Sequence, residues 1–285
     1  MAAPPQVFDH ALIAARLARR AEPVDFVTAL VLDDLAERLA TISRSFERAL
    51  IMAPDARALP AAARTAAGPI AFDVAATHHT AGALALDPEA LVLPHTDYDL
   101  IVSVLDLQAI NDVPGFLARI RQHLRPDGLF LGAALGGASL TQLRQAFLVA
   151  DAEHSGGAFG RVAPFIDVRD AGALLQRAGF ALPVADIETH TVRYSSPIAL
   201  MAELKTMGAA NPLADRPGRL ATPKLLAAAS AAYADLASDP DGRVRATLEI
   251  VWMSGWAPAP TQQKPLAPGS ATMDLRSVLK DKSVR

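Results

Sequence analysis

Apolar residues recur at helical spacing through the first part of the chain. From Phe8 to about Phe46, large apolar side chains are interleaved with charged ones at intervals that gather them on one helix face. This pattern predicts a helical lead-in over residues 1–46, ahead of the first strand.

Short apolar runs then alternate with helical stretches. The clearest run is Tyr98–Leu105, which has the apolar character expected of a strand in a parallel sheet covered on both faces. The other predicted strands are Ala49–Ala53, Pro69–Val74, Leu84–Asp87, Leu129–Leu135, Phe180–Val184 and Thr247–Met253.

Helices are predicted between several of these strands. Ala58–Ala67 is rich in alanine, Asp112 can cap a helix that begins at Val113-Pro114, and Gly179 ends a helix over Asp167–Ala178. Strands and helices that alternate at these lengths indicate an α/β fold with a doubly wound, mostly parallel sheet of seven strands.

The alternation breaks after Tyr194. Ser196-Pro197 and Thr222-Pro223 each open a further helix before the last predicted strand. We therefore expect a helical insertion at 196–240 within a domain of residues 47–256, followed by a proline-rich tail at 257–285.

Composition excludes several kinds of function. With 27 basic and 30 acidic residues the net charge is −3, so no cationic field attracts nucleic-acid phosphates. The chain has no cysteine, which excludes disulfides, thiolate zinc sites and cysteine nucleophiles. We interpret the pair His78-His79 as surface histidines, because a metal site would need further ligands such as Asp73 or His95. We expect neither nucleic acid nor metal as a ligand.

Nothing in the sequence predicts export or membrane insertion. The first residues lack the basic cluster and apolar run of a secretory signal, and we interpret the basic residues Arg16, Arg19 and Arg20 as a solvated helix face rather than a transit peptide. No apolar run approaches the ~20 residues that span a bilayer. We therefore expect a cytoplasmic protein.

Several segments, in order along the chain, resemble the mitochondrial complex I assembly factor 5 family and its bacterial relatives. The most specific are Asn111–Pro114, Leu124–Phe130 with its Pro-Asp-Gly turn, and Gly269–Thr272. The central sheet is more distantly similar to the malonyl-carrier-protein methyltransferases of biotin synthesis. The resemblance implies the class I S-adenosylmethionine-dependent methyltransferase fold, which is Rossmann-like, over nearly the whole chain.

The resemblance also implies where S-adenosylmethionine would bind. In the superfamily a glycine-rich loop follows the first strand, an acid ending the second strand accepts the ribose hydroxyls, and another after the third meets the adenine. The matching candidates for cofactor binding are Ala53, Asp55, Asp73, Asp87 and Ser103; no residue is assigned a catalytic role. A helix N-cap is the alternative role for Asp73. Ser103 lacks the Gly-x-Ser-x-Gly surroundings of a hydrolytic nucleophile.

The glycine loop itself departs from the family pattern. Where the family reads Asp-Leu-Gly-x-Gly-x-Gly, this chain has Ile51–Arg57, without the acid or the glycines. Asp55 and Arg57 place charged side chains where backbone should approach the ligand, and Pro54 constrains the turn. The next glycine is Gly68, so no neighbouring register restores the loop. We expect affinity for S-adenosylmethionine to be much reduced or absent.

Three functions remain open. One is a methyltransferase that acts on a protein or carrier-bound substrate through a remodelled loop, although Gln108-Ala109 stands where the family has His-Trp. The second, implied by the resemblance, is an arginine hydroxylase for an iron–sulfur subunit of respiratory complex I, in the mitochondrial matrix if the chain is eukaryotic. The third is a catalytically silent module that binds a complex I subunit or an active homologue.

Overall fold

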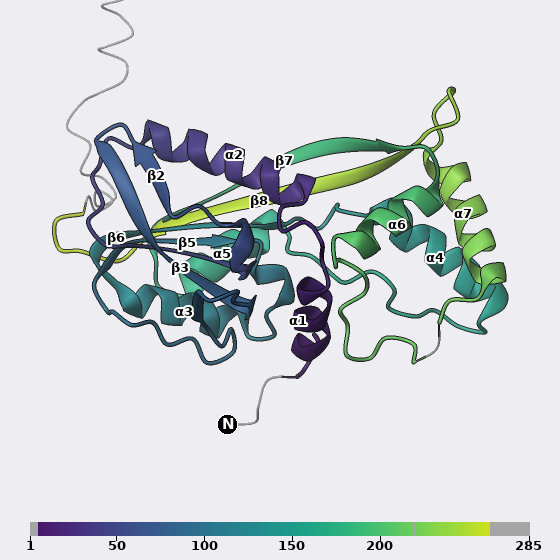
Figure 1. Ribbon diagram of the computed structural model, residues 1–285, viewed down its shortest axis with the longest axis horizontal. Helices are drawn as coiled ribbons and strands as arrows, with labels where there is room; N and C mark the ends of the chain where they lie inside the picture. Colours follow the sequence, from purple (N-terminus) through teal and green to yellow (C-terminus); the bar gives the residue numbers. More distant parts are fainter. Residues whose placement is uncertain (1–4, 219, 263–285) are drawn as a thin grey trace, which may run out of the picture.

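Strands built from the apolar runs pair into one mixed sheet with helices on both faces (Figure 1). The computed structural model describes residues 5–218 and 220–262. In that part of the chain the strand order is β2-β3-β1-β5-β6-β8-β7, and β4 also pairs with β3. The strands are β1 Ala49–Asp55, β2 Ala62–Thr65, β3 Gly68–His79, β4 Leu84–Ala85, β5 Tyr98–Val104, β6 Leu124–Leu135, β7 Ala181–Tyr194 and β8 Val244–Trp256.

Without β2, the remaining strands form the predicted doubly wound, mostly parallel sheet of seven, and the predicted fold class is confirmed. β3, β1, β5 and β6 run parallel, whereas β8 is antiparallel to both β6 and β7. The chain order reverses at β1, which lies between β3 and β5, so the carboxyl ends of these strands are the expected ligand site.

Alternate residues of the central strands pack against helices on opposite faces. The helices are α1 His10–Ala18, α2 Phe26–Thr41, α3 Val113–His123, α4 Thr141–His154, α5 Val168–Arg177, α6 Pro197–Thr206 and α7 Pro223–Ala237. Leu50 and Met52 of β1 belong to the apolar cluster with α3 and α5, while Ile51 belongs to the cluster with α2. Burial on both faces explains why β1 and β5 are continuously apolar.

The predicted helix over Ala58–Ala67 is wrong. A short 3₁₀ turn, η1 (Ala56–Ala58), is followed by β2, which forms an antiparallel hairpin with the first half of β3. Thr65 anchors the hairpin, because its buried hydroxyl donates to the carbonyls of Arg44 and Gly68. This tertiary contact overrides the helix propensity of alanine, which is a weak preference. As a result, no helix N-terminus faces the cleft directly after β1.

The second predicted strand is also longer than expected. β3 continues to His79, so Asp73 lies in the middle of the strand and does not end it. Its exposed carboxylate accepts a hydrogen bond from the Tyr98 hydroxyl at 3.2 Å. The extension arises because β4 and β1 both pair with the second half of β3, through Ala75 and Ala76.

The predicted insertion is present as α6 and α7, between β7 and β8. In Figure 1 these helices lie with α4 at one end of the long β7–β8 ribbon, away from α3 and α5. Tyr233 of α7 ties the group to the ribbon by donating to the carbonyl of Arg245 at 2.9 Å. The boundaries 1–46, 47–256 and 257–285 stay a prediction, and most of the predicted tail, residues 263–285, lies outside the described residues.

Candidate functional site

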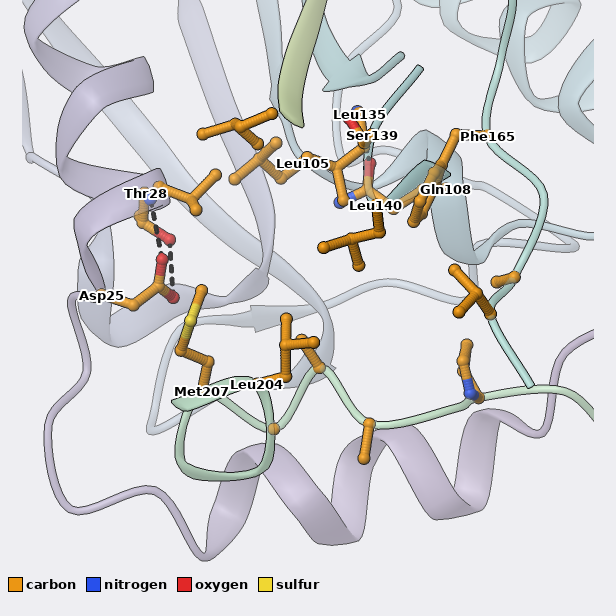
Figure 2. A pocket seen from close by; sticks show the side chains of 18 of the residues that line it. Asp25, Thr28, Leu105, Gln108, Leu135, Ser139, Leu140, Phe165, Leu204 and Met207 are labelled. Carbon is orange, nitrogen blue, oxygen red and sulfur yellow. Dashed lines mark hydrogen bonds between the residues drawn. The ribbon is translucent and has the colours of Figure 1, made fainter. Parts of the chain in front are cut away.

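A cavity of about 430 Å³ lies beside the carboxyl ends of β1, β5 and β6. Its other walls include α1, the start of α2, helices α4 and α6, and parts of β7 and β8. Figure 2 shows Leu105, Leu135 and Leu140 on one side of it, with Leu204 and Met207 opposite. The cavity is therefore formed by the sheet edge where this topology binds ligands and by the inserted helix α6.

An ion pair occupies the position of the expected glycine loop. Asp55, only 3% exposed, accepts three hydrogen bonds from the Arg57 guanidinium, at 2.7, 3.0 and 3.2 Å. The same guanidinium donates to the carbonyl of Leu17, at the C-terminal end of α1, at 2.9 Å. Asp55 also caps η1 by accepting from the Arg57 backbone N–H. The charges that replace the glycines thus tie the N-terminal helix to β1.

The structure brings only two of the five cofactor candidates together. Ala53 and Asp55 line the cavity, whereas Asp73, Asp87 and Ser103 do not. Asp87 is exposed beyond β4 and caps the backbone N–H of Glu89. Ser103 is fully buried within β5. The residues present therefore do not fit S-adenosylmethionine as the superfamily binds it: the loop backbone is closed by the Asp55–Arg57 pair, and no candidate acid is left to meet the ribose.

A buried acid stands at the strand ends instead. Asp106 lies two residues after the end of β5 and has no exposed surface. It is hydrogen bonded to Thr77 of β3 at 2.6 Å and to Ser103 at 3.1 Å. Burial raises the pKa of Asp106 to about 7, against the smaller opposing effect of the two hydroxyls. These bonds join the ends of β3 and β5 across the end of the strand between them, β1.

Asp106 is the first member of a hydrogen-bonded chain that reaches α1. The hydroxyl of Thr77 is 2.9 Å from Nδ1 of His78, whose Nε2 is 2.9 Å from Nδ1 of His10. Nε2 of His10 is in turn 2.9 Å from Glu89. With Asp106 protonated, one proton per contact can run through these four contacts in one direction, ending on the Glu89 carboxylate. Nε2 of His10 then also faces the amide Nδ2 of Asn111 at 2.9 Å, a second donor that opposes this arrangement. With Asp106 ionised, Thr77 must donate to it, and the histidine protons must reverse.

The environment of His78 favours its neutral form. Burial lowers the pKa of His78 to about 4, and the neighbouring His10 lowers it further, although Glu89 opposes both effects. Glu89 also accepts from the backbone N–H groups of Asn111 and Asp112, in the motif that carried the resemblance. His78 is thus a partly buried link between the sheet and α1 rather than the surface histidine that the sequence suggested. Among the described residues, no group of three or more His, Cys, Asp or Glu side chains could hold a metal ion.

Sequence reasoning missed Asp106, His10 and Glu89. Asp106 had a local signal, because it directly follows the most apolar strand, where parallel sheets place functional side chains. His10 and Glu89 had none, since they meet only through the packing of α1 against the end of β3.

Comparison with known proteins agrees with this fold. The chain is 38% identical over 194 residues to the arginine-hydroxylase NDUFAF5 of Danio rerio, covering 68% of this chain and 60% of that protein. It is 34% identical over 192 residues to the malonyl-[acyl-carrier protein] O-methyltransferase of Halorhodospira halophila, covering 67% and 63%. The chain thus spans less than two thirds of each of these relatives. No family model matches the sequence.

A solved structure shares the same architecture. The YcgJ protein of Bacillus subtilis superposes with a TM-score of 0.50 at 12% identity, over 81% of this chain and 99% of that one. Among the described residues, no helix is long and apolar enough to cross a membrane. By its strand order and its relatives, the chain has the class I methyltransferase fold, and its sequence resembles the NDUFAF5 proteins and the malonyl-[acyl-carrier protein] O-methyltransferases.

Proposed function

We propose that this chain is a non-catalytic member of the methyltransferase superfamily that acts as a binding module in protein assembly. The observation that carries the proposal is the Asp55–Arg57 pair, which fills the place of the glycine loop and is fixed to the backbone of α1. A cofactor held at this loop would have to displace an ion pair whose carboxylate is buried, and detach a helix. The fold is retained while its usual cofactor site is closed.

The partner we propose is a subunit of respiratory complex I or an active homologue of this chain. Support comes from the resemblance to NDUFAF5, and from the hairpin β2–β3, which removes the helix that would otherwise follow the cofactor loop. The chain would meet such a partner in the cytoplasm, or in the mitochondrial matrix if the source is eukaryotic. Methyl transfer and arginine hydroxylation are the competing functions.

Calorimetric titration with S-adenosylmethionine tests the closed site. The expected result is no binding heat at millimolar ligand, with a class I methyltransferase that has an intact glycine loop as the positive control. We expect that the triple variant Ala53→Gly, Asp55→Gly, Arg57→Gly does not bind S-adenosylmethionine either, because the β2–β3 hairpin still stands where a helix would otherwise follow the cofactor loop. Micromolar binding by the wild-type chain would contradict the proposal.

Partner capture tests the assembly role. The tagged full chain, expressed in its own source cell and cross-linked before lysis, should recover a complex I subunit or a homologous methyltransferase. Mass spectrometry of the recovered partner should show the same pattern of arginine hydroxylation and methylation with and without this chain. A modification that disappears when the chain is deleted, and returns only with the purified chain in vitro, would identify an enzyme.

A further inference from the structure

We propose that the cavity binds an uncharged aliphatic chain that carries one oxygen acceptor, such as a medium-chain fatty alcohol or ester. The proposal goes beyond the binding-module function, which requires no small ligand. It concerns the part of the cleft beyond Asp55, between the strand ends and α6. Ligand cavities are mostly apolar with a few placed polar groups, and the walls of this cavity show which chemistry fits.

Aliphatic and aromatic side chains make up most of the wall. Figure 2 shows leucines from the loops after β5 and β6 facing leucine and methionine from α6 and its C-cap. Methionine side chains adapt to ligands of irregular shape, which suits a flexible chain. The apolar side chains lining the cavity include Ile13, Leu17, Phe26, Leu105, Leu135, Leu140, Leu143, Phe147, Phe165, Leu200, Met201, Leu204 and Met207.

Most polar side chains in the wall are already engaged within the protein. Asp55 is bonded to Arg57, and Arg161 donates two hydrogen bonds of 2.6 Å to Asp151. Ser139 both donates to and accepts from the backbone of Glu249. A charged or hydroxyl-rich ligand would find its partners occupied, so desolvating it would cost more than its contacts return. A hydrocarbon meets no such penalty.

Gln108 is the exception and defines the polar end of the ligand. Its side chain lines the cavity (Figure 2). Its Oε1 accepts from the backbone N–H of Leu135 at 3.5 Å, while its Nε2 donates to no other described residue. One ligand oxygen would accept a hydrogen bond from this amide N–H. Because the amide is neutral and Asp25 pairs with the Arg20 guanidinium at 2.7 Å, the fitting acceptor is uncharged.

Backbone strain marks the same cavity. Leu105 and Leu140 both line it, with φ angles of 57° and 56° in the left-handed region that side chains other than glycine rarely adopt. Strain of this kind persists where the surrounding structure enforces it, and it clusters at ligand sites. Here it holds two leucine side chains at the wall of one cavity.

Titration with 1-dodecanol, kept below the concentration at which it aggregates, tests the proposal. Saturable binding to the wild-type chain, measured by calorimetry and as a rise in melting temperature, is expected, with dodecanoate binding more weakly. Leu204→Trp should weaken dodecanol binding more than tenfold by filling the cavity. Ile198→Trp, on the same helix but 49% exposed and outside the cavity, should bind as the wild type does. Met207→Trp repeats the test if Leu204→Trp does not fold.

Gln108→Met tests the polar end, because methionine has a similar length but no amide N–H. It should weaken dodecanol binding about fivefold, the effect of one lost hydrogen bond. Absence of dodecanol binding by the wild type, equal binding by a folded Leu204→Trp, or tighter binding of dodecanoate would each overturn the proposal. Dodecanol and S-adenosylmethionine are titrated separately, so failure here is distinguishable from failure of the proposed function.

Discussion

Protonation of Asp106 couples the strand ends to solution pH. Its pKa is raised to about 7 in the folded chain, above the ordinary value of 3.8, so the folded state binds the proton more tightly than the unfolded state. Its contribution to stability is present below pH ~4 and is lost as the pH rises through about 7. Asp106→Asn should remove this loss, and at pH 8 should gain up to roughly 4 kcal/mol relative to the wild type.

Urea unfolding of both proteins from pH 4 to 8 measures this effect. The difference in free energy of unfolding between variant and wild type should grow from pH 4 to about pH 7 and then level off. Asp87→Asn, at an exposed acid outside the network, is the matched control and should track the wild type. A difference that stays constant with pH would show that Asp106 titrates as an ordinary carboxyl.

The contribution of His78 to stability should depend on pH in the opposite direction. Burial lowers its pKa to about 4 from 6.5, so its contribution to stability is present above pH ~6.5 and is lost as the pH falls through about 4. His78→Gln should therefore reduce the acid sensitivity of the wild type by about 3 kcal/mol between these limits. NMR titration of the ring protons measures the pKa directly, and a value near 6.5 would refute this prediction.

At the scale of elements, Arg57 fixes α1 to β1. Arg57→Ala leaves Asp55 buried without its cation, and should lower the free energy of unfolding by about 2 kcal/mol, since Arg57 is itself partly exposed. Hydrogen exchange in α1 should accelerate more than exchange in α3. In the double variant Asp55→Asn, Arg57→Met, no unpaired charge remains, so the loss should be smaller. An equal loss in both variants would show that the charge pair does not hold the helix.

Sequence patterns predicted the buried elements well and the sheet edge poorly. Tyr98–Val104 and the helix starting at Val113 were predicted because continuous apolar character and an Asp N-cap are local signals. Ala58–Ala67 was misassigned because its strand pairing depends on β3, and on carbonyls that Thr65 reaches only in the folded chain. The position of Asp73 depended likewise on how far β3 extends.

For the site, the sequence predicted the loss of the glycine loop but not what replaced it. Ala53 and Asp55 were placed at the cavity because they end a strand that the pattern locates. The cavity itself joins residues from α1 to β8, more than 200 positions apart. The spacing of apolar residues along the chain cannot predict contacts between such distant positions. His10 and His78 illustrate this, because each is unremarkable locally and they meet only in the fold.

At the scale of the whole molecule, the helical group α4, α6 and α7 should lose its structure before the sheet does. It packs on the sheet through Val244 and Ala246, at the start of β8. Trp252 and Trp256 lie in the second half of that strand, where the guanidinium groups of Arg38 and Arg44 stack on their rings. Ala229 of α7 is fully buried against α4. Ala229→Asp therefore places an unpaired charge in this contact and should destabilise the helical group by about 3 kcal/mol.

The readouts of Ala229→Asp separate the two ends of the molecule. Hydrogen exchange should increase in α4, α6 and α7 while tryptophan emission stays native, and dodecanol binding should be lost, because α4 and α6 supply a wall of its cavity. Ser230→Asp, at the neighbouring and partly exposed position, is the control and should leave exchange and binding near wild-type values. Simultaneous loss of tryptophan packing would show that sheet and helical group unfold together, and the cavity would then lie within one cooperative unit.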